Sequence, residues 1–232
     1  MRRDERVAVI IPALNEAGHI GPLVEETLRQ PVESVIVVDN GSTDGTGRLA
    51  REAGADVVVE PRRGYGYACA AGSRKALLSG AAILVYMDGD FSSPPGELSR
   101  VLSPIWEGRA DLVLGSRIRG EIASGAMPPH QRFGNWFSAV LMRLLYGVSV
   151  TDLGPFRAIR AEWLERLDMK EMTFGWPTEM MVKAARQGGS IVEVPVSWHI
   201  RKSGRSKVGG TVSGSVRAAY TILRVTLKYA YR

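Results

Sequence analysis

Two aspartates separated by one glycine are the residues of this chain best placed to do chemistry. They follow residues 82–87, an apolar and β-branched run that predicts a buried strand. Because they are two apart in extended chain, the side chains of Asp88 and Asp90 share a face. Pro94 and Pro95 follow and prevent the strand from continuing. Two hard oxygen donors at a strand end suit Mg²⁺ or Mn²⁺ shared with the phosphates of a substrate.

A plain turn is the alternative for this pair, because Asp-Gly is a common turn dipeptide. An EF-hand loop is excluded, since it would need glycine and glutamate where the chain has Ser93 and Ser99. The sequence of the pair alone does not distinguish a turn from a cation site. The predicted strands and helices around it must therefore be considered.

Strand and helix patterns alternate along the chain. We expect strands at residues 7–11, 34–38, 56–59, 83–87, 111–114, 156–159 and 191–196. We expect helices at residues 19–29, 44–53, 67–78, 98–106, 133–146 and 212–231. This order predicts an α/β fold, a three-layer α/β/α sandwich with a mostly parallel mixed central sheet. Ligands of such folds bind where the strands end.

Length, cysteine count, apolar runs and net charge limit the class of protein to which this chain can belong. The 232 residues, 45% of them apolar, are enough for one domain with a sizeable core. The one cysteine, Cys69, excludes an intramolecular disulfide. Residues 7–14 are too short for a secretory signal, and no run of about 18 apolar residues predicts a membrane-spanning helix. The net charge of +6 favours nucleotides, phosphates, lipid headgroups or nucleic acid as partners.

The first two predicted strands end in polar residues. The first runs into Pro12, Ala13, Asn15 and Glu16, without the glycine-rich turn of a dinucleotide-binding unit. Asn15 and Glu16 could cap the next helix or meet a nucleotide lying over the strand ends. The second strand runs into Asp39, which comes too early to cap the following helix. Its carboxylate could accept hydrogen bonds from a nucleobase or a ribose.

A basic loop with two glycines precedes the third predicted helix. It fits neither the P-loop nor the G-x-G-x-x-G spacing. Gly66 could let the backbone approach a donor substrate while Arg63 meets its phosphate. A flexible basic loop without a ligand is the alternative.

Three stretches together resemble the family 2 glycosyltransferases of GT-A fold, and among them the dolichyl- or polyprenyl-phosphate sugar synthases. They are Ile-Ile-Pro-Ala-Leu-Asn-Glu at residues 10–16, Val-Asp-Asn-Gly-Ser-Thr-Asp-Gly-Thr at 38–46 and Asp-Gly-Asp at 88–90. The likeness continues through Leu-Gly-Ser-Arg at 114–117, Asp-Leu-Gly-Pro-Phe-Arg at 152–157 and Gly-Arg-Ser-Lys at 204–207. It covers nearly the whole chain.

The resemblance implies one GT-A domain over residues 1–232. Residues 1–120 would bind the nucleotide-sugar, residues 121–210 would bind the acceptor, and residues 211–232 would form a basic amphipathic helix. The nucleotide would be lined by Pro12, Ala13, Asn15, Glu16 and Asp39. The stretch Asp88-Gly89-Asp90 would handle ribose, metal and diphosphate, with Asp88 and Asp90 as metal ligands.

The implied cofactor is Mg²⁺ or Mn²⁺, which would stabilise the charge on the departing nucleoside diphosphate, so Asp90 counts as catalytic. Many relatives carry Gln or His directly after the acidic pair, where this chain has Phe91 and Ser92. Coordination would therefore depend more on water or diphosphate oxygens.

The absence of an aspartate after Glu179 bears on the chemical class of the acceptor. In relatives that act on sugars or proteins, a Glu-Asp pair precedes a helix and its Asp is the general base. Here Glu179 is followed by Met180. A hydroxyl acceptor needs its proton removed, whereas a phosphate monoester, with a second pKa of about 6, is already largely anionic. Glu179 could take the base role itself, which keeps a soluble or carbohydrate acceptor as the alternative.

An acceptor phosphate needs cations to hold it. The candidates are Arg117, Arg157, Arg205 and Lys207. Arg117 directly follows a predicted strand, so it is the best placed, and we count it as catalytic as well. Solvated surface charge is the alternative for each of the four.

Two predicted helices carry apolar stripes. The first stripe consists of Phe133, Trp136, Phe137, Val140, Leu141, Leu144 and Val148. A buried core or a dimer face would explain it equally well. The second consists of Val212, Val216, Ala219, Leu223, Leu227 and Ala230, with Arg217, Arg224, Lys228 and Arg232 on another side. This second pattern suits a helix on an anionic membrane surface, or one packed on the domain with its charges in water.

We therefore expect an inverting, metal-dependent enzyme that moves a hexose from a UDP- or GDP-sugar to a polyprenyl or dolichyl phosphate. It would be cytoplasmic and peripheral at the cytoplasmic face of the membrane, as a homodimer or with a separate membrane partner. A nucleotidyltransferase is disfavoured because no glycine-rich activation loop with a following lysine succeeds the first strand. A non-catalytic basic module for membrane or nucleic acid is the last alternative, although we expect no nucleic-acid partner. His19, His130 and His199 lack metal-ligand spacing.

Overall fold

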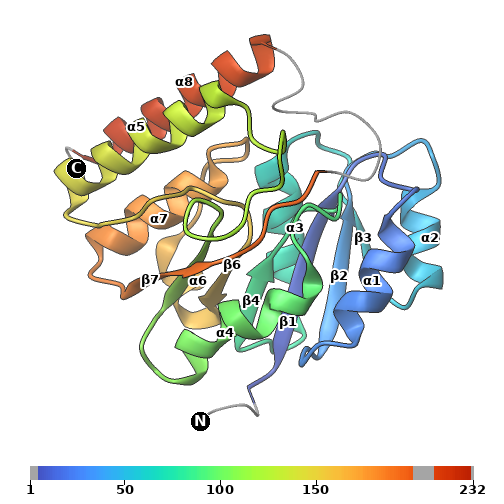
Figure 1. Cartoon of the computed structure of the whole chain (residues 1–232). Coiled ribbons are helices and arrows are strands. Elements are labelled where there is room, and N and C mark those ends of the chain that lie inside the picture. The colour runs from blue at the N-terminus through green and yellow to red at the C-terminus, as the bar shows by residue number, and fades with distance from the viewer. Residues whose placement is uncertain (1–4, 201–211, 231–232) are drawn as a thin grey trace.

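The computed structural model describes residues 5–200 and 212–230 (Figure 1). Within them, seven strands form one sheet in the order β3-β2-β1-β4-β6-β5-β7. The strands are β1 (Val7–Ala13), β2 (Ser34–Asp39), β3 (Asp56–Val59), β4 (Ile83–Tyr86), β5 (Leu112–Ser116), β6 (Arg157–Arg160) and β7 (Ile191–Pro195). The helices are α1 (Ile20–Leu28), α2 (Thr46–Glu52), α3 (Tyr65–Leu78), α4 (Leu98–Trp106), α5 (Pro129–Tyr146), α6 (Ala161–Leu167), α7 (Trp176–Arg186) and α8 (Val212–Lys228).

The sheet is mixed but mostly parallel. β1 pairs in parallel with β2 and β4, β2 pairs in parallel with β3, and β5 pairs in parallel with β7. β6 runs antiparallel to both of its neighbours, β4 and β5. The carboxyl ends of the other six strands therefore meet at one edge of the sheet, together with the amino end of β6. The polar residues that follow β1, β2, β4 and β5 are gathered at this edge.

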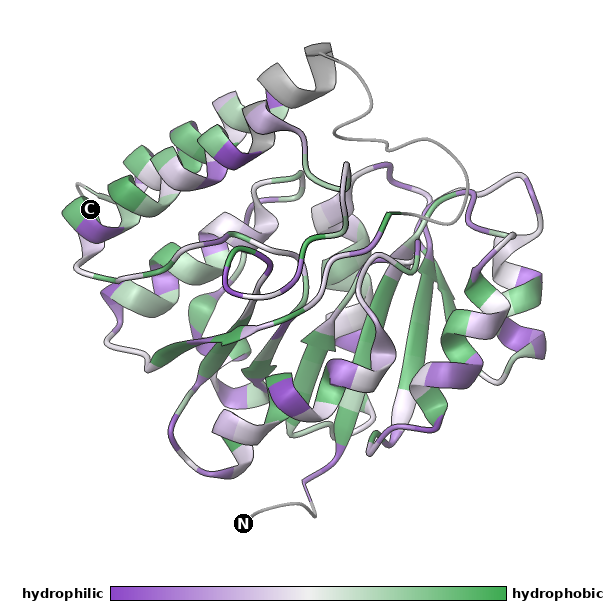
Figure 2. Cartoon of the chain, in the orientation of Figure 1, coloured by the Kyte–Doolittle hydropathy of each residue, from purple (hydrophilic) through white to green (hydrophobic). Residues whose placement is uncertain are grey.

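The core has two parts, one on each face of the sheet. Side chains of α1, α2 and α4 pack on one face, and side chains of α3, α6 and α7 pack on the other. Along β1, Val7, Val9 and Ile11 belong to the first part, while Ala8 and Ile10 belong to the second. Strands buried on both faces are apolar throughout, which explains the continuous apolar runs of the sequence. Figure 2 shows these strands as mostly hydrophobic.

The predicted sandwich and its alternating elements are confirmed, with differences at the boundaries. β1 extends to Ala13 and β2 extends to Asp39, each beyond its predicted end. α2 begins at Thr46 rather than at residue 44, because the side chain of Asp44 accepts a hydrogen bond from the Thr46 N–H and so precedes the helix. α6 and α7 were not among the expected elements. α5 and α8 lie side by side over α7, outside the layer that covers the sheet (Figure 1).

No helix in the described part of the chain combines the length and the apolar character needed to cross a bilayer.

The contact between α3 and the sheet yields the first prediction. A Cβ at Gly72 would lie 2.5 Å from Cγ2 of Ile10 and 2.9 Å from Cγ2 of Val38. We expect Gly72→Ala to lower the free energy of unfolding by roughly 1–3 kcal/mol, because overpacking exceeds the gain in helix propensity. Gly21→Ala on α1 is the matched control, since nothing lies within 4 Å of its Cβ position. Urea denaturation measures both, and equal stabilities of the two variants would contradict the close packing.

Candidate active site

The acidic pair lies beside the end of β1. β1 and β4 pair up to Ile10 and Tyr86, and the Met87 N–H donates to the Ile10 carbonyl oxygen. A Cβ at Gly89 would lie 3.4 Å from the Pro12 carbonyl oxygen and 3.6 Å from Cγ of Glu16. On the other side of β1, Ala13 pairs with Asp39 of β2. The structure thus brings together the three predicted strand-end motifs.

The turn after β4 fixes Asp90. One carboxylate oxygen of Asp90 accepts the Ser92 N–H at 3.0 Å and the Ser92 hydroxyl at 2.5 Å. Between them, Phe91 has φ 62° and is buried. A left-handed phenylalanine costs conformational energy and persists only where the surroundings enforce it. Asp88 and Asp90 are both half-buried, which leaves part of each side chain accessible from the strand-end edge.

The carboxylate oxygens at this strand end are of the kind that bind a divalent cation shared with a substrate. Asp88 and Asp90 supply carboxylate oxygens, which Mg²⁺ and Mn²⁺ prefer. In the described residues no group of three or more His, Cys, Asp or Glu side chains could hold a metal by itself. Residues 5–200 and 212–230 thus form no complete cage, and the remaining ligands would be phosphate oxygens and water, which is how Mg²⁺ is commonly held.

Asn15 and Glu16 tie two loops together. The Asn15 side-chain oxygen accepts the Thr43 N–H at 2.8 Å, and the Asn15 N–H donates to the Ser42 hydroxyl. The Glu16 N–H donates to the Thr46 hydroxyl, and α1 has no side-chain cap. These bonds hold the loop after β1 against the loop after β2. At the start of α1, the backbone carbonyl oxygen of Glu16 also accepts the N–H groups of His19 and Ile20, at 3.0 Å each.

Asp39 has a local partner, in the turn before α2, that the sequence analysis did not predict. One of its carboxylate oxygens accepts the Ser42 N–H at 2.8 Å, so Asp39 closes the turn after β2. Gly47 leaves space for the other oxygen, since a Cβ there would lie 2.6 Å from it. The turn residue Asp44 also binds across to the first loop, accepting the Ala17 N–H. Burial alone would raise the pKa of Asp44, but its hydrogen bonds from Thr46 and Ala17 outweigh this and lower it.

The basic loop before α3 lies against the same turn. Arg63 is exposed and its guanidinium donates to the Gly41 carbonyl oxygen at 3.0 Å. Gly66 was expected to let the backbone approach a donor substrate, but it makes room for another part of the chain. A Cβ at this position would lie 2.5 Å from the carbonyl oxygen of Glu171, so the glycine admits a neighbouring stretch of the chain itself. The close approach expected of a donor is made by that backbone.

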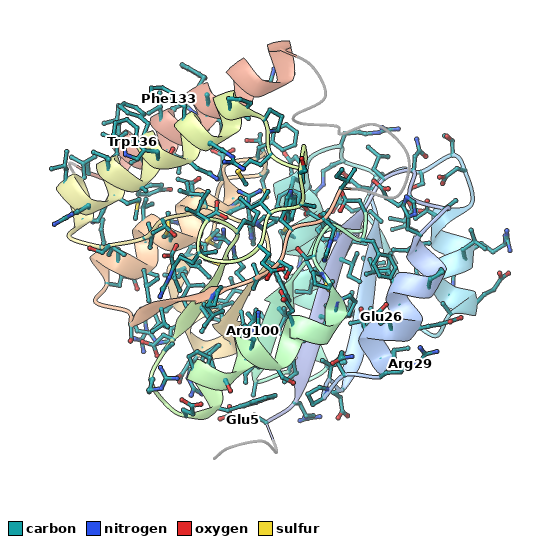
Figure 3. All side chains as sticks on the ribbon, viewed as in Figure 1. Glu5, Glu26, Arg29, Arg100, Phe133 and Trp136 are labelled. Carbon is teal, nitrogen blue, oxygen red and sulfur yellow. The ribbon has the colours of Figure 1, made fainter. Side chains whose placement is uncertain are left out.

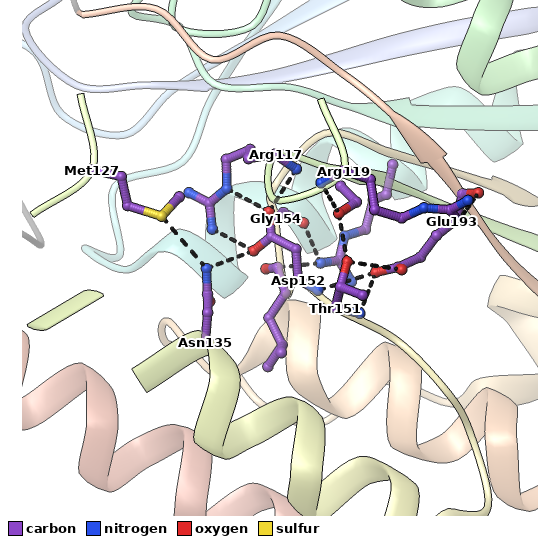
Figure 4. Close-up of polar contacts among 11 residues, drawn as sticks. Arg117, Arg119, Met127, Asn135, Thr151, Asp152, Gly154 and Glu193 are labelled. Atoms are coloured by element: carbon purple, nitrogen blue, oxygen red, sulfur yellow. Dashed lines mark hydrogen bonds and ion pairs between the residues drawn. The ribbon is translucent and has the colours of Figure 1, made fainter. Parts of the chain in front are cut away.

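Arg117, one residue beyond β5, belongs to a hydrogen-bonded network around Asp152 (Figure 4). Asp152 is fully buried and accepts the Arg117 N–H at 2.9 Å, its Nε at 2.7 Å and its Nη2 at 2.7 Å. Asn135 of α5 donates to the same carboxylate at 2.7 Å. Burial would lower the pKa of Arg117, but the ion pair with Asp152 outweighs it and raises the pKa. The guanidinium is therefore charged and held by one edge, with Nη1 on the opposite side.

The segment after β7 supplies residues that sequence reasoning missed. The Trp198 ring lies 4.8 Å from the Arg117 guanidinium in a cation–π contact, and the His199 N–H donates to the Ser92 carbonyl oxygen. His199 and Phe91 line a hollow of about 460 Å³ next to the acidic turn. Nothing in the local sequence indicated this contact, because it joins residues about a hundred positions apart in the chain.

Arg157 is a correction to the expected phosphate-binding set. It is buried, and its guanidinium donates to the carbonyl oxygens of Pro177, Leu153 and Gly154. Burial lowers its pKa to about 10. The side chain fastens the turn before β6 to α7 and is enclosed by protein, so we no longer count it among the groups that could meet an acceptor.

Glu179 is a second correction, because it does not have the access that a base needs. The side chain is fully buried, and its oxygens accept the N–H groups of Lys170 and Glu171 and the hydroxyl of Tyr229. Lys183 forms an ion pair with it at 2.9 Å. Burial would raise the pKa of Glu179, but these donors outweigh it and lower the pKa. The carboxylate is a buried junction between α7 and α8.

Arg205 and Lys207, the other two predicted phosphate ligands, lie outside the described residues.

The chain belongs to glycosyltransferase family 2, whose model matches residues 8–168. It is 35% identical to an undecaprenyl-phosphate mannosyltransferase of Micrococcus luteus, over 90% of both chains. It is also 36% identical to a polyprenol monophosphomannose synthase of Mycolicibacterium smegmatis, over 91% of this chain and 84% of that one. The membership makes the chain a nucleotide-sugar-dependent hexosyltransferase by class.

The fold has a solved counterpart. Glucosyl-3-phosphoglycerate synthase of Mycobacterium tuberculosis, crystallised with Mn²⁺, uridine diphosphate and phosphoglyceric acid, matches with a TM-score of 0.75 over 98% of this chain and 79% of that one. The sequences are 19% identical, so the match supports the GT-A fold alone.

The buried ion pair of Glu179 leads to a prediction about how the free energy of unfolding depends on pH. We expect Glu179→Gln to lower the free energy of unfolding at pH 7 by about 2 kcal/mol, because Lys183 loses a buried counter-charge. The native carboxyl has a depressed pKa, so its stabilisation is full above the ordinary value of 4.5 and disappears as the pH falls further. The difference between variant and parent should therefore shrink below that pH. Denaturation curves at several pH values test it, and a constant difference would contradict the ionised junction.

Proposed function

We propose that this chain transfers a hexose from a UDP- or GDP-sugar to a polyprenyl phosphate, with inversion at the anomeric carbon. The relatives of Micrococcus luteus and Mycolicibacterium smegmatis, which are named for mannose transfer to polyprenyl carriers, support mannose as the sugar. The observation that carries the acceptor class is the enclosure of Glu179 within the protein. With that carboxylate inaccessible, an acceptor that is already ionised fits this site better than a hydroxyl.

The donor would lie over the ends of β1, β2 and β4. Pro12, Ala13 and Asp39 occupy adjacent strand ends, and Arg63 reaches the turn beside them. Asn15 and Glu16 contribute mainly by fixing the two loops against each other. Asp88 and Asp90 would hold Mg²⁺ or Mn²⁺, which when bound would offset the charge that develops on the leaving diphosphate.

The acceptor phosphate would meet Arg117. Asp152 and Trp198 hold its guanidinium by one edge and one face, so the group is oriented before any ligand arrives. A guanidinium with a fixed plane suits bidentate binding of phosphate oxygens. The phosphate oxygen would then attack the anomeric carbon from the side opposite the departing diphosphate, which gives inversion in a single displacement.

The donor half of the proposal is tested by the acidic pair. We expect UDP or GDP with Mn²⁺ to raise the melting temperature of the parent chain, and Asp90→Asn to remove this shift and lower kcat by about 100-fold or more. Asp56→Asn is the matched control, because Asp56 begins β3 at the opposite edge of the sheet. A metal-dependent shift that survives in Asp90→Asn would overturn the assignment of the metal ligands.

The acceptor half is tested by Arg117→Lys, which keeps a cation beside Asp152 but removes the planar fork. We expect kcat/KM for a polyprenyl phosphate to fall about tenfold or more while the KM of the sugar donor is unchanged. Arg119→Lys is the control, since Arg119 is exposed and only two residues away. The labelled hexose should enter the organic phase with a polyprenyl phosphate and not with the free polyprenol. Transfer to a soluble sugar instead would refute the acceptor class.

A further inference from the structure

Both outer helices expose large apolar side chains, and the side chains that they turn inward include uncharged polar ones. On α8, the residues buried against the protein include Thr221, Val225 and Thr226. Tyr220 is 66% exposed and Leu227 is 47% exposed, on the opposite side of the helix. A helix that packs on a soluble domain normally shows the reverse arrangement. Part of the apolar stripe predicted for this helix, Ala219 and Leu227, therefore does not contact the core.

α5 is turned in the same sense. Asn135, Ser138 and Met142 face the protein: Ser138 and Met142 are buried, and Asn135 reaches Asp152. Phe133 is 64% exposed, Trp136 is 58% exposed and Leu144 is 75% exposed. Figure 3 shows Phe133 and Trp136 on the outer side of α5. Phe133, Trp136 and Leu144 of the predicted stripe are thus not covered by another part of the described chain, whereas Val148 at its end packs against the core.

The two helices form one continuous face. They lie side by side, and the hydroxyl of Tyr146 on α5 donates to the carbonyl oxygen of Thr226 on α8. We define the α5/α8 surface by its exposed apolar residues, Phe133, Trp136, Leu144, Tyr220 and Leu227. Monomeric soluble proteins rarely leave so many large apolar side chains together in water, so the surface requires an occupant.

The charges around the α5/α8 surface identify that occupant. Neither helix contains an aspartate or a glutamate. Exposed cations border the apolar residues: Arg132, Arg143, Arg217, Arg224 and Lys228. Arg224 also pairs with Glu171, and the other four have no ion pair within the described residues. A second copy of the chain would bring like charges together, whereas anionic lipid headgroups would neutralise them.

We propose that the α5/α8 surface docks the enzyme on an anionic bilayer, with both helices lying in the plane of the interface. The aromatic rings would enter the boundary between headgroups and acyl chains, where Trp and Tyr are favoured, and the arginines and lysine would meet the headgroups. This inference rests on the proposed lipid acceptor and adds the structural element that brings the enzyme to it.

The α5/α8 surface is connected to the proposed phosphate site. Asn135 lies between Phe133 and Trp136 in the sequence and points to the other side of the helix, where it donates to Asp152. Asp152 in turn holds Arg117. Two hydrogen-bonded contacts therefore join the membrane-facing helix to the cation that would hold the lipid phosphate. Docking would fix the height of Arg117 relative to the headgroups, which is where the phosphate of a membrane-embedded polyprenyl chain lies.

The test uses the whole chain and vesicles that contain no polyprenyl phosphate, so that docking is measured separately from transfer. Vesicles of equal parts phosphatidylcholine and phosphatidylglycerol are compared with vesicles of phosphatidylcholine alone in a flotation experiment. We expect binding to the anionic vesicles, with Phe133→Ser/Trp136→Ser lowering the partition coefficient by about tenfold or more. Leu78→Ser is the control, since Leu78 is 81% exposed on α3.

The cations and one intrinsic probe give further readouts. Arg217→Gln/Lys228→Gln should weaken binding about fivefold per charge. Arg29→Gln/Arg51→Gln, directly after α1 and on α2, should not. Trp136 is exposed, Trp198 is half-buried on Arg117, and Trp106, Trp163 and Trp176 are buried. Vesicles should therefore shift the fluorescence of the parent chain to the blue, and the shift should be much smaller for Trp136→Phe. Unchanged melting temperatures would show that the variants are folded.

Three outcomes overturn the docking proposal: no flotation of the parent chain, equal binding of the Phe133→Ser/Trp136→Ser variant, or a dimer in solution that this variant dissociates. A dimer that the variant dissociates would show that a second copy of the chain covers the α5/α8 surface. Failure of docking with intact transfer to a detergent-dispersed polyprenyl phosphate would leave the proposed function standing. Vesicle binding without such transfer would refute the acceptor and keep the docking surface.

Discussion

A buried negative charge at Asp152 is the constraint on which the proposed acceptor side of the site depends. An uncompensated carboxylate in the interior would cost several kcal/mol, so the chain must bring donors to it. The donors come from the end of β5 and from α5, while the neighbouring Thr151 and Asp152 N–H groups donate to Glu193 of β7. Gly154 permits the approach, because a Cβ there would lie 2.8 Å from the Gly115 carbonyl oxygen. The desolvated charge of Asp152 thereby joins the end of β5 to α5 and orients Arg117, and the carboxylate of Glu193 fastens the same segment to β7.

The donor side depends on backbone register instead. Parallel pairing of β1 with β2 and β4 places Ala13 beside Asp39 and the acidic turn beside Pro12, and no side-chain charge is required for that alignment. Hydrogen bonds between the loops then remove the freedom that polar strand-end residues would otherwise keep. The left-handed Phe91 marks the place where this rigid frame imposes an unfavourable conformation, directly after Asp90. The two halves of the site are thus built on different physical grounds, pairing geometry and charge compensation.

Local patterns were sufficient to predict the strands, most of the helices and the meeting of the strand-end motifs, because these follow from periodicity and from the direction of parallel strands. The roles of individual charged residues were not predictable in the same way. Arg157 and Glu179 have the residue types of a phosphate ligand and a base, but whether a charge faces a substrate or a buried partner depends on contacts with distant residues. The partners of Glu179 include Tyr229, 50 residues away, and those of Arg157 include Pro177, 20 residues away.

The outer helices show the same limit in a more general form. A period of 3.6 residues reports that two faces of a helix differ, but it does not report which face meets the protein. For α8 the sequence was compatible with two environments of the apolar stripe, the protein core and a membrane surface. The structure places Val225 and two threonines against the protein and leaves Tyr220 and Leu227 outside. Threonine hydroxyls can be satisfied by the carbonyl oxygens of their own helix, as Thr221 and Thr226 are, so a threonine-rich face can be buried at little cost. That internal satisfaction allows α8 to bury its threonines while Tyr220 and Leu227 stay outside.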